Sequence, residues 1–297
     1  MNENNSEYPL IYVLILNYNS PYDSIELFKQ IQNQVYKNFD VFIMDNNSTD
    51  NSKKLLKNSI PKANLILNEV NLGYAGGNNI GIKKAIENGA DFVWILNPDI
   101  RIEEDTLKII ITTISKNEKI AAVGPRICQR DNKKIIYSDG GIFRVAEGLK
   151  TGHLNSGKNI NDVEEIISSR SVDYINGSCI LIRVAAIKEI GYMREDFFLY
   201  FEETEWCYRA RMKGKVLLTT NEAVVYHQES KKKSTYYFYM TRNRIYLSRI
   251  LNKYIIKTVF SELMGIINQA SKLYFYRAFI KSIGLAAGLF KKKVHQF

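Results

Sequence analysis

Cysteine is scarce in this sequence, and the cysteines present are not spaced for cross-linking or for binding a metal. Cys128, Cys179 and Cys207 are scattered over 297 residues and form no CxxC pair. Their number excludes a disulfide framework, and their spacing excludes a cysteine-bound zinc site. We therefore expect three reduced thiols, as in a cytosolic protein.

Long apolar runs are also missing. The first ten residues, MNENNSEYPL, are polar and lack the basic and apolar regions of a signal peptide, so we expect none. Towards the other end, the longest uncharged runs are 263–271 and 282–290. Because a membrane span needs about 20 consecutive apolar residues, these runs predict no transmembrane segment.

Two common phosphate-binding motifs are absent. There is no GxxxxGK[ST], which excludes a P-loop ATPase, and no GxGxxG after the first predicted strand, which disfavours a dinucleotide-dependent oxidoreductase. The composition, with 45% hydrophobic and 24% charged residues, excludes disordered and collagen-like proteins. The length allows one large domain or two small ones.

Acidic residues are almost absent from the last part of the chain. Residues 231–297 contain 14 Lys and Arg but a single acid, Glu262, whereas residues 1–230 contain 27 basic and 30 acidic residues. A basic, aromatic-rich end favours an anionic membrane surface as a partner, and the alternative is a solvated helical tail. The slightly acidic body argues against nucleic acid. We predict a main domain over 1–230 and a basic, aromatic, helical region over 231–297.

The first half of the chain alternates between two patterns. Short, branched apolar runs predict buried strands, and longer stretches with helical spacing of apolar residues separate them. This alternation predicts βαβ units and an α/β fold with a mostly parallel sheet covered by helices; the alternative is an antiparallel sheet with packed helices. The predicted strands are 10–17, 40–45, 63–69, 91–97 and 120–127, and the predicted helices are 20–37, 48–60, 76–89 and 103–117.

The second half is less regular. Residues 128–171 are polar and predict an irregular, functional loop. They are followed by a predicted strand over 172–184 that is interrupted at Asn176–Gly177, a helix over 198–214 and a strand over 215–227. Helices are expected after Lys231.

Polar residues follow each of the first four predicted strands. In a parallel sheet, the carboxyl ends of the strands meet at one edge, and ligands bind beyond it. The edge would carry amides, a few carboxylates and glycines that permit close backbone approach. With the common phosphate loops excluded, this edge suits a nucleotide-activated substrate held through a divalent metal.

Eight motifs follow one another in order along the chain: LNYN (16–19), DNNSTD (45–50), NLGYAGGNN (71–79), LNPD (96–99), SDGG (138–141), NGSCILIR (176–183), FFLYFEETEWCYR (197–209) and VVYH (224–227). In order and spacing they resemble the motifs of family 2 glycosyltransferases of the GT-A fold, most closely the bacterial rhamnosyltransferase-like branch. The resemblance extends over about residues 9–250 and implies a GT-A catalytic domain over 1–230, with a Rossmann-like sheet.

The resemblance implies a binding site for a nucleoside diphosphate sugar donor. Motifs at the strand ends would contact the base, the ribose, the diphosphate and the sugar. The residues implied are Asn17, Tyr18, Asn19, Asp45, Asn47, Gly73, Ala75, Asn78, Asn97, Asp99 and Gly177.

The resemblance also implies a divalent cation, Mg²⁺ or Mn²⁺. Asp99 matches the last position of the DxD-like metal motif, while Asn97 stands where a full DxD has its first acid. A single carboxylate binds a hard cation more weakly than two do. His227, at the end of a predicted strand, is the second implied ligand; the alternative is a packed or solvated histidine.

The implied catalytic base belongs to the acidic pair Glu202–Glu203, with Glu203 in the base position. Transfer with inversion needs one base beside the acceptor hydroxyl. The family has aspartate here, so glutamate lengthens the reach by one methylene. The alternative for Glu203 is an exposed acid at a helix start. Glu205 lies four residues before Arg209, which predicts a structural ion pair.

These expectations define one hypothesis and two alternatives. The first is an inverting glycosyltransferase that moves rhamnose or another hexose from a nucleoside diphosphate sugar to a hydroxyl of a lipid-linked cell-surface glycan. It would be cytoplasmic and peripheral on the inner face of the cell membrane. One alternative is a non-catalytic, membrane-associated glycan-assembly module. The other, a sugar-1-phosphate nucleotidyltransferase, would need a Gly-rich loop with Arg and Lys after the first strand, and NYNSPYDS has neither.

Overall fold

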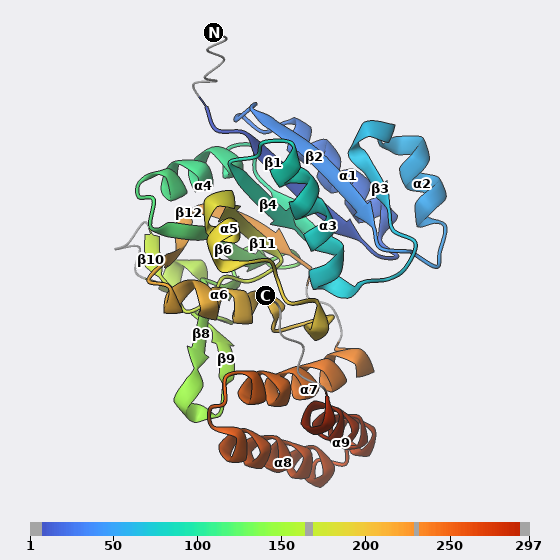
Figure 1. Ribbon diagram of the computed structural model, residues 1–297, viewed down its shortest axis with the longest axis vertical. Helices are drawn as coiled ribbons and strands as arrows, with labels where there is room; N and C mark the ends of the chain where they lie inside the picture. Colours follow the sequence, from blue (N-terminus) through green and yellow to red (C-terminus); the bar gives the residue numbers. More distant parts are fainter. Residues whose placement is uncertain (1–7, 164–168, 229–231, 292–297) are drawn as a thin grey trace.

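The computed structural model describes residues 8–163, 169–228 and 232–291, and a large sheet forms its centre (Figure 1). The strands are β1 (Ile11–Asn17), β2 (Phe39–Asp45), β3 (Leu65–Leu67), β4 (Phe92–Leu96), β5 (Ile100–Ile102), β6 (Ile120–Gln129), β7 (Ile136–Ser138), β8 (Gly141–Arg144), β9 (Lys150–His153), β10 (Ser169–Ser171), β11 (Cys179–Arg183) and β12 (Val216–His227). The sheet order is β10-β12-β6-β11-β4-β1-β2-β3, with β5 paired to β12 and β7 to β6. Strands β8 and β9 form a separate hairpin.

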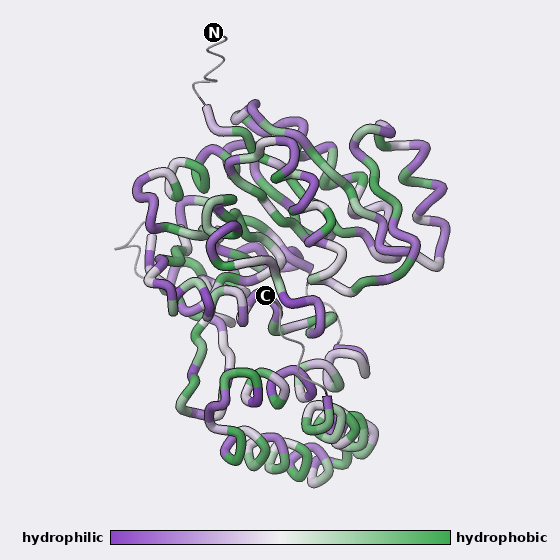
Figure 2. The backbone as a smooth tube through the Cα atoms, viewed as in Figure 1, coloured by the Kyte–Doolittle hydropathy of each residue, from purple (hydrophilic) through white to green (hydrophobic). Residues whose placement is uncertain are grey.

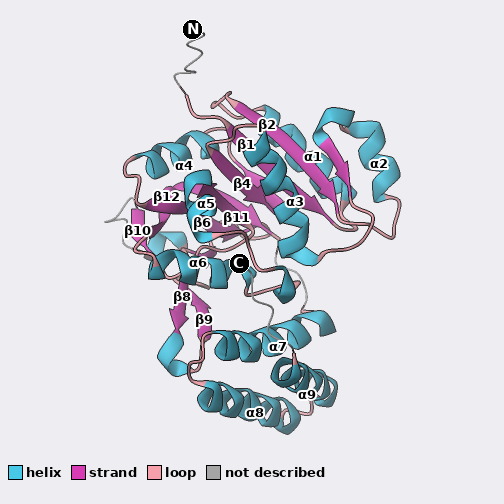
Figure 3. Cartoon of the chain, viewed as in Figure 1, coloured by secondary structure: helices cyan, strands magenta, loops and turns pink. Residues whose placement is uncertain are grey.

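The sheet is mixed but largely parallel, as predicted. Strand β1 runs parallel to β2 and β4, β2 is parallel to β3, and β6 is parallel to β12. Strand β11 is inserted antiparallel between β4 and β6. Each of the first four predicted strands is present, and they share one edge where their carboxyl ends meet (Figure 3).

Helices cover both faces of the sheet, and two more lie away from it. The helices are α1 (Pro21–Gln32), α2 (Ser52–Ser59), α3 (Gly73–Glu87), α4 (Thr106–Ser115), α5 (Val184–Ile190), α6 (Glu202–Met212), α7 (Ser234–Ile250), α8 (Ile255–Ser271) and α9 (Phe275–Phe290). Short 3₁₀ turns occur at Lys62–Asn64, Val145–Glu147, Ile160–Asp162 and Glu195–Phe197.

Strand β1 shows how one sequence pattern fills two cores. Because successive side chains of a strand point to opposite faces, Ile11, Val13 and Ile15 pack with α1, α2 and α4. Tyr12 and Leu14 pack on the other face, with α3, α5, α6 and α7. Apolar residues are accordingly concentrated along the central strands in Figure 2. The three cysteines are buried and unpaired, as predicted.

Three predicted segments differ from the structure. Residues 128–171 are not irregular throughout, since they contain β7, the β8–β9 hairpin and β10. These strands have only three or four residues and no regular alternation of apolar and polar side chains. The sequence pattern therefore did not predict them. In 172–184, ordered strand begins only at Cys179. The helix predicted from 198 begins at Glu202, because Phe198, Tyr200 and Phe201 have positive φ angles.

Over the described residues 232–291 the chain forms three helices, α7, α8 and α9, as expected from the sequence. Helix α7 packs into the core of the main domain, where Ile245, Tyr246 and Leu247 are fully buried. Helices α8 and α9 lie beyond α7, on the side away from the large sheet (Figure 1). Within the described residues, no helix combines the length and apolar character needed to cross a membrane.

Candidate functional site

Asn17 and Asp45 lie side by side at the carboxyl ends of β1 and β2. The register pairs them, and Asn17 Nδ2 donates to Asp45 Oδ2 over 2.8 Å. The other Asp45 oxygen accepts the Ser48 amide at 3.0 Å, and Asn17 Oδ1 accepts the Ser24 hydroxyl at 2.8 Å. Both side chains are fully buried. They therefore support the loop after β2 from the interior of the protein.

A cavity of about 390 Å³ opens at the carboxyl ends of β1, β2 and β4; we call it the strand-end cavity. Four predicted donor-site residues line it: Tyr18, Gly73, Asn97 and Asp99. The sequence analysis did not assign the other lining residues to the site: Leu16, Ser20, Asp23, Asn46, Asn71, Tyr74, Pro98, Phe198, Leu199 and Gln228.

Other predicted donor-site residues lie around or beneath this cavity. Asn19 and Asn47 stand in the loops after β1 and β2, with φ angles of 55° and 60°. Ala75 and Asn78 are fully buried on α3. Asn19 and Asn47 both have a left-handed backbone conformation that few non-glycine residues adopt. This conformation fixes the shape of the loops after β1 and β2.

Asn46 ties together the segments around the strand-end cavity. Its Nδ2 donates to Asn71 Oδ1 at 2.9 Å and to the Gly73 carbonyl at 3.0 Å. Its Oδ1 accepts hydrogen bonds from Asn68 Nδ2 and the Leu72 amide, each at 3.1 Å. The sequence did not single out Asn46 as a site residue. Its position directly after Asp45, within the motif DNNSTD, could have identified it.

Gly73 lets two loops meet at the cavity. Its φ angle is +70°, and a Cβ there would overlap the Phe198 carbonyl oxygen. The next residue, Tyr74, donates its amide to that same carbonyl at 2.6 Å. A side chain at position 73 would therefore separate the start of α3 from the loop before α6.

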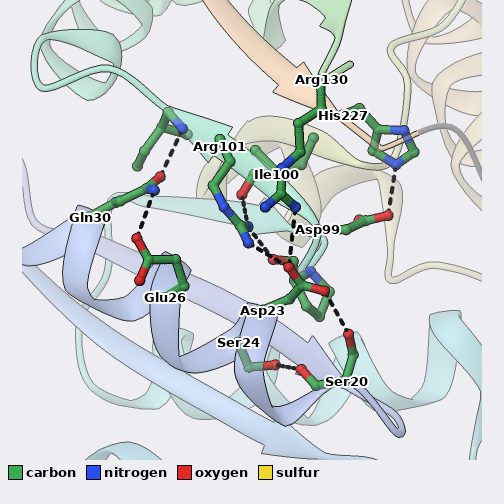
Figure 4. Close-up of polar contacts among 12 residues, drawn as sticks. Ser20, Asp23, Ser24, Glu26, Gln30, Asp99, Ile100, Arg101, Arg130 and His227 are labelled. Atoms are coloured by element: carbon green, nitrogen blue, oxygen red, sulfur yellow. Dashed lines mark hydrogen bonds and ion pairs between the residues drawn. The ribbon is translucent and has the colours of Figure 1, made fainter.

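Asp99 and His227 face each other at the cavity (Figure 4). The pairing of β5 with β12 places His227 opposite Ile100, and Asp99 Oδ2 lies 3.5 Å from His227 Nε2. His227 Nδ1 is buried and has no hydrogen-bond partner within the described parts of the chain. The Tyr137 ring stacks beside the imidazole, 5.3 Å between centroids.

This pair fits a divalent cation. A carboxylate oxygen and an imidazole nitrogen are both ligands for Mn²⁺, and a diphosphate supplies further oxygens. No cluster of three or more His, Cys, Asp or Glu suited to a metal occurs among the residues that the structure describes. A cation here would thus depend on ligands from the substrate.

Asp23 anchors two arginines at the rim of the same cavity (Figure 4). It forms ion pairs with Arg101 and, at 3.3 Å, with Arg130. Burial opposes ionisation of Asp23, but the Arg101 and Arg130 contacts outweigh it and lower the pKa of the carboxyl group. Sequence reasoning missed all three residues, because their separation along the chain gave no local motif.

Glu203 lies beside the strand-end cavity, at the start of α6. A Cβ built on Gly177 would be 3.4 Å from Glu203 Cγ and 3.1 Å from the Tyr74 hydroxyl, which donates to the Gly177 carbonyl. Tyr74 lines the cavity, and Gly177 lies against both Tyr74 and Glu203. Burial raises the pKa of Glu203 above its ordinary value. A carboxylate of raised pKa is a stronger base.

Glu202 differs from its neighbour. Its side chain is almost fully buried, and one carboxylate oxygen has no hydrogen-bond partner within the described residues. Burial, followed by the charge of Glu203, raises its pKa well above the ordinary value. The third acid, Glu205, forms the predicted ion pair with Arg209 at 2.8 Å.

The segment before α6 is backbone-strained and clamped by α7. Phe198, Tyr200 and Phe201 have φ angles of 66°, 67° and 75°. Left-handed backbone of this kind persists only where neighbours enforce it. The buried Asn243 side chain donates to three carbonyl groups in the segment, those of Phe197 (3.1 Å), Leu199 (2.7 Å) and Tyr200 (2.7 Å).

Comparison with known proteins agrees with this geometry. The profile of "Glycosyl transferase family 2" matches residues 12–191, and the chain belongs to this family. Over 203 residues it is 30% identical to the low-salt glycan biosynthesis hexosyltransferase Agl10 of Haloferax volcanii, covering 67% of this chain and 61% of that one.

Two further proteins resemble the chain. It is 25% identical over 183 residues to the N-acetylglucosaminyl-diphospho-decaprenol L-rhamnosyltransferase of Mycobacterium tuberculosis, covering 56% of this chain and 58% of that one. These alignments span about three-fifths of the length of the curated relatives. The mannosyltransferase PcManGT of Pyrobaculum calidifontis, solved with GDP-Man and Mn²⁺, superposes with a TM-score of 0.59 at 15% identity, covering 97% and 89%. The fold is therefore of the GT-A type.

Proposed function

We propose that this protein transfers a hexosyl group, rhamnose or another hexose, from a nucleoside diphosphate sugar to a hydroxyl group with inversion. One observation carries the proposal. Asp99, which faces His227, lines the strand-end cavity, and the hydroxyl of Tyr74, another lining residue, lies beside Gly177, as does the Glu203 side chain.

The donor would lie in the strand-end cavity. Tyr18, Gly73, Asn97 and Asp99 line it and would contact nucleotide and diphosphate. Asn17 and Asp45 support the loop beneath, while Asn19 and Asn47 shape its rim. Gly177 is a further proposed donor contact, whereas Ala75 and Asn78, which are fully buried, would act on the donor through the position of Gly73 and Tyr74 at the start of α3.

Asp99 and His227 would hold Mg²⁺ or Mn²⁺ against the donor diphosphate. A bound divalent cation supplies neutralisation of the charge that develops on the leaving diphosphate. In the transfer step, the Glu203 carboxylate takes the proton of the acceptor hydroxyl. The acceptor oxygen bonds to the anomeric carbon from the face opposite the leaving group. The carbon–oxygen bond to the diphosphate breaks, and its electron pair leaves with the nucleoside diphosphate.

We also propose that the acceptor is a lipid-linked cell-surface glycan and that the protein sits peripherally on the inner, cytoplasmic face of the membrane. Helix α8 exposes Ile256, Phe260 and Ile267, which are 87%, 62% and 57% exposed and share one helical face. Helix α9 exposes Phe275 and Phe279 in the same manner. Figure 2 shows this apolar character along both helices. The name of the mycobacterial relative supports a lipid-diphosphate acceptor.

A thermal-shift panel of nucleoside diphosphate sugars, with and without Mn²⁺, tests the donor assignment. A donor that binds the folded state raises Tm by mass action, and we expect one sugar nucleotide to stand out and to need Mn²⁺. The Asp99→Ala variant should lose this metal-dependent shift, whereas Asp162→Ala, which removes an exposed acid elsewhere, should retain it. A panel with no shift, or a shift unaffected by Asp99→Ala, would contradict the proposal.

A further inference from the structure

A second cavity lies between the β8–β9 hairpin and the three C-terminal helices, and nothing in the proposed transfer step uses it. Its volume is about 500 Å³, and we call it the basic cavity. Six basic side chains line it, and Glu262 is the single acid among its described lining residues. The lining comprises Arg144, Lys150, Thr151, Phe201, Lys232, Tyr236, Tyr237, Met240, Thr241, Arg244, Glu262, Gln269, Arg277 and Lys281.

The acid in this cavity is already neutralised. Glu262 is paired with Arg244 at 2.7 Å and with Lys281 at 2.8 Å, and it accepts the Thr241 hydroxyl at 3.1 Å. Both carboxylate oxygens are thereby used. Within the described residues, no ion pair involves Lys150, Lys232 or Arg277, so the cavity keeps a positive field suited to an anion.

Specific contacts between the β8–β9 hairpin and the C-terminal helices hold the walls of the basic cavity in place. Arg244 Nε donates to the Gly148 carbonyl at 2.8 Å, which fastens the hairpin tip to α7. A Cβ at Gly148 would lie 3.2 Å from the Thr258 backbone, so the tip also presses against α8. Arg277 lies over the Tyr274 ring, 4.4 Å from its centroid. A guanidinium fixed over a ring keeps its N–H groups free for a phosphate.

The basic cavity also adjoins the catalytic elements. Phe198 and Leu199 line the strand-end cavity, while Phe201, two residues later, lines the basic cavity. The segment 198–201 therefore contributes to both cavities and leads into α6, which carries Glu203. An acceptor whose hydroxyl reaches Glu203 would extend its other end towards the basic side chains.

A further feature points to a polar ligand. Gln269 lines the basic cavity, and its Oε1 is buried without a hydrogen-bond partner among the described residues. A buried carbonyl oxygen left unpaired is destabilising, and a hydroxyl of the acceptor sugar could donate to it. The exposed apolar faces of α8 and α9 belong to the same helices that contribute Gln269 and Arg277, so a lipid chain has an apolar surface near the cavity.

From these observations we propose that the basic cavity binds the phosphate or diphosphate group that joins the lipid to the acceptor sugar. This assignment rests on the proposed function, since it names the acceptor end of that reaction. Anionic phospholipid headgroups share the phosphate chemistry, and the test separates the two sources.

The test uses geranyl diphosphate, a water-soluble lipid diphosphate, as the probe in calorimetric titrations of the full chain. We expect the Lys150→Ala/Arg277→Ala double variant to lose at least about 10-fold in affinity, because two charge-assisted contacts are removed. The matched control, Lys54→Ala/Lys108→Ala, removes the same charge from exposed positions on α2 and α4 and should leave Kd unchanged. The nucleoside diphosphate that stabilises the protein most should not displace the probe.

Two results would overturn the assignment. One is displacement of the probe by the nucleoside diphosphate together with unchanged affinity in the double variant, which would put the probe in the strand-end cavity. The other is a double variant that loses flotation with phosphatidylglycerol vesicles, compared with phosphatidylcholine vesicles, while its affinity for geranyl diphosphate is unchanged. Neither readout requires sugar transfer, so a failed transfer assay with the predicted binding pattern would count against the proposed function alone.

Discussion

The two cavities of this protein differ in how they are made. The strand-end cavity is lined mainly by residues that follow β1, β2, β3 and β4, so the parallel sheet itself brings its amide and carboxylate groups together. The basic cavity is assembled from a hairpin and three helices of the C-terminal half, and its charge comes from Lys and Arg. The proposed donor site thus comes from the sheet and the proposed acceptor site from elements outside it, so substitutions should affect the two separately.

Glu203 is the proposed base, and changing it should give the largest effect. We expect Glu203→Gln to lower kcat by about 10²–10⁴-fold, because the acceptor hydroxyl loses its base. Affinity for both donor and geranyl diphosphate should stay unchanged. Glu203→Asp, which shortens the side chain but keeps the carboxylate, should recover part of the rate. Normal turnover in the Glu203→Gln variant would show that Glu203 is not the catalytic base.

Gly73 offers a way to disturb one cavity and not the other. Gly73→Ala combines left-handed backbone with a Cβ that overlaps the Phe198 carbonyl, so we expect about 3 kcal/mol of destabilisation. Gly89→Ala has a similar φ, +81°, but nothing within 4 Å of the added Cβ. It should cost only the backbone strain of about 1–2 kcal/mol.

Denaturant midpoints and donor affinity check this pair. The donor should bind more weakly to Gly73→Ala even in conditions where the variant is fully folded, while geranyl diphosphate binding is retained. Equal stabilities of the two alanine variants would show that the loops do not need the close approach.

Asn243 tests whether the segment 198–201 is held from α7. Asn243→Ala leaves three carbonyl groups without their amide donor, which should cost about 1–3 kcal/mol and lower kcat. The control, Asn268→Ala, changes an exposed asparagine on α8 and should be neutral. An unchanged kcat in Asn243→Ala, together with a lower Tm, would show that the contact from α7 stabilises the fold but does not affect catalysis.

The contrast between the cavities also explains what could be read from the sequence. Strand ends such as LNYN and DNNSTD put the chemistry within a few residues of a periodic apolar run, so the edge of the sheet was predictable. Asp23 and Arg101 meet only in the folded chain, because α1 and β5 pack together, and no local pattern announces that contact. The predicted division at residue 230 stays a prediction, although α7 beyond it enters the core of the main domain.

The positive φ angles before α6 were equally hidden. Phe198, Tyr200 and Phe201 carry no glycine-like signal, and the apolar-aromatic run FFLYF reads as the start of a helix. The strain is imposed by distant groups, Asn243 on α7 and the Tyr74 amide on α3. Tertiary contacts thus decide the backbone at the point where local preference would continue the helix.

The smallest expected effect concerns Glu202, which is buried on the same turn of α6 as Glu203. Its pKa is higher in the folded state than in the unfolded chain, so the folded state binds the proton more tightly. The resulting stability is present below the unfolded pKa and is lost as pH rises through the folded pKa.

The Glu202→Gln substitution keeps the shape of the side chain and removes its ionisable group. Its Tm relative to the parent protein should therefore be higher at about pH 8 than at about pH 5. The matched Glu26→Gln substitution, at an exposed position on α1, should show no such difference. A pH-independent Glu202→Gln effect would mean that Glu202 is ionised at equal cost in both states.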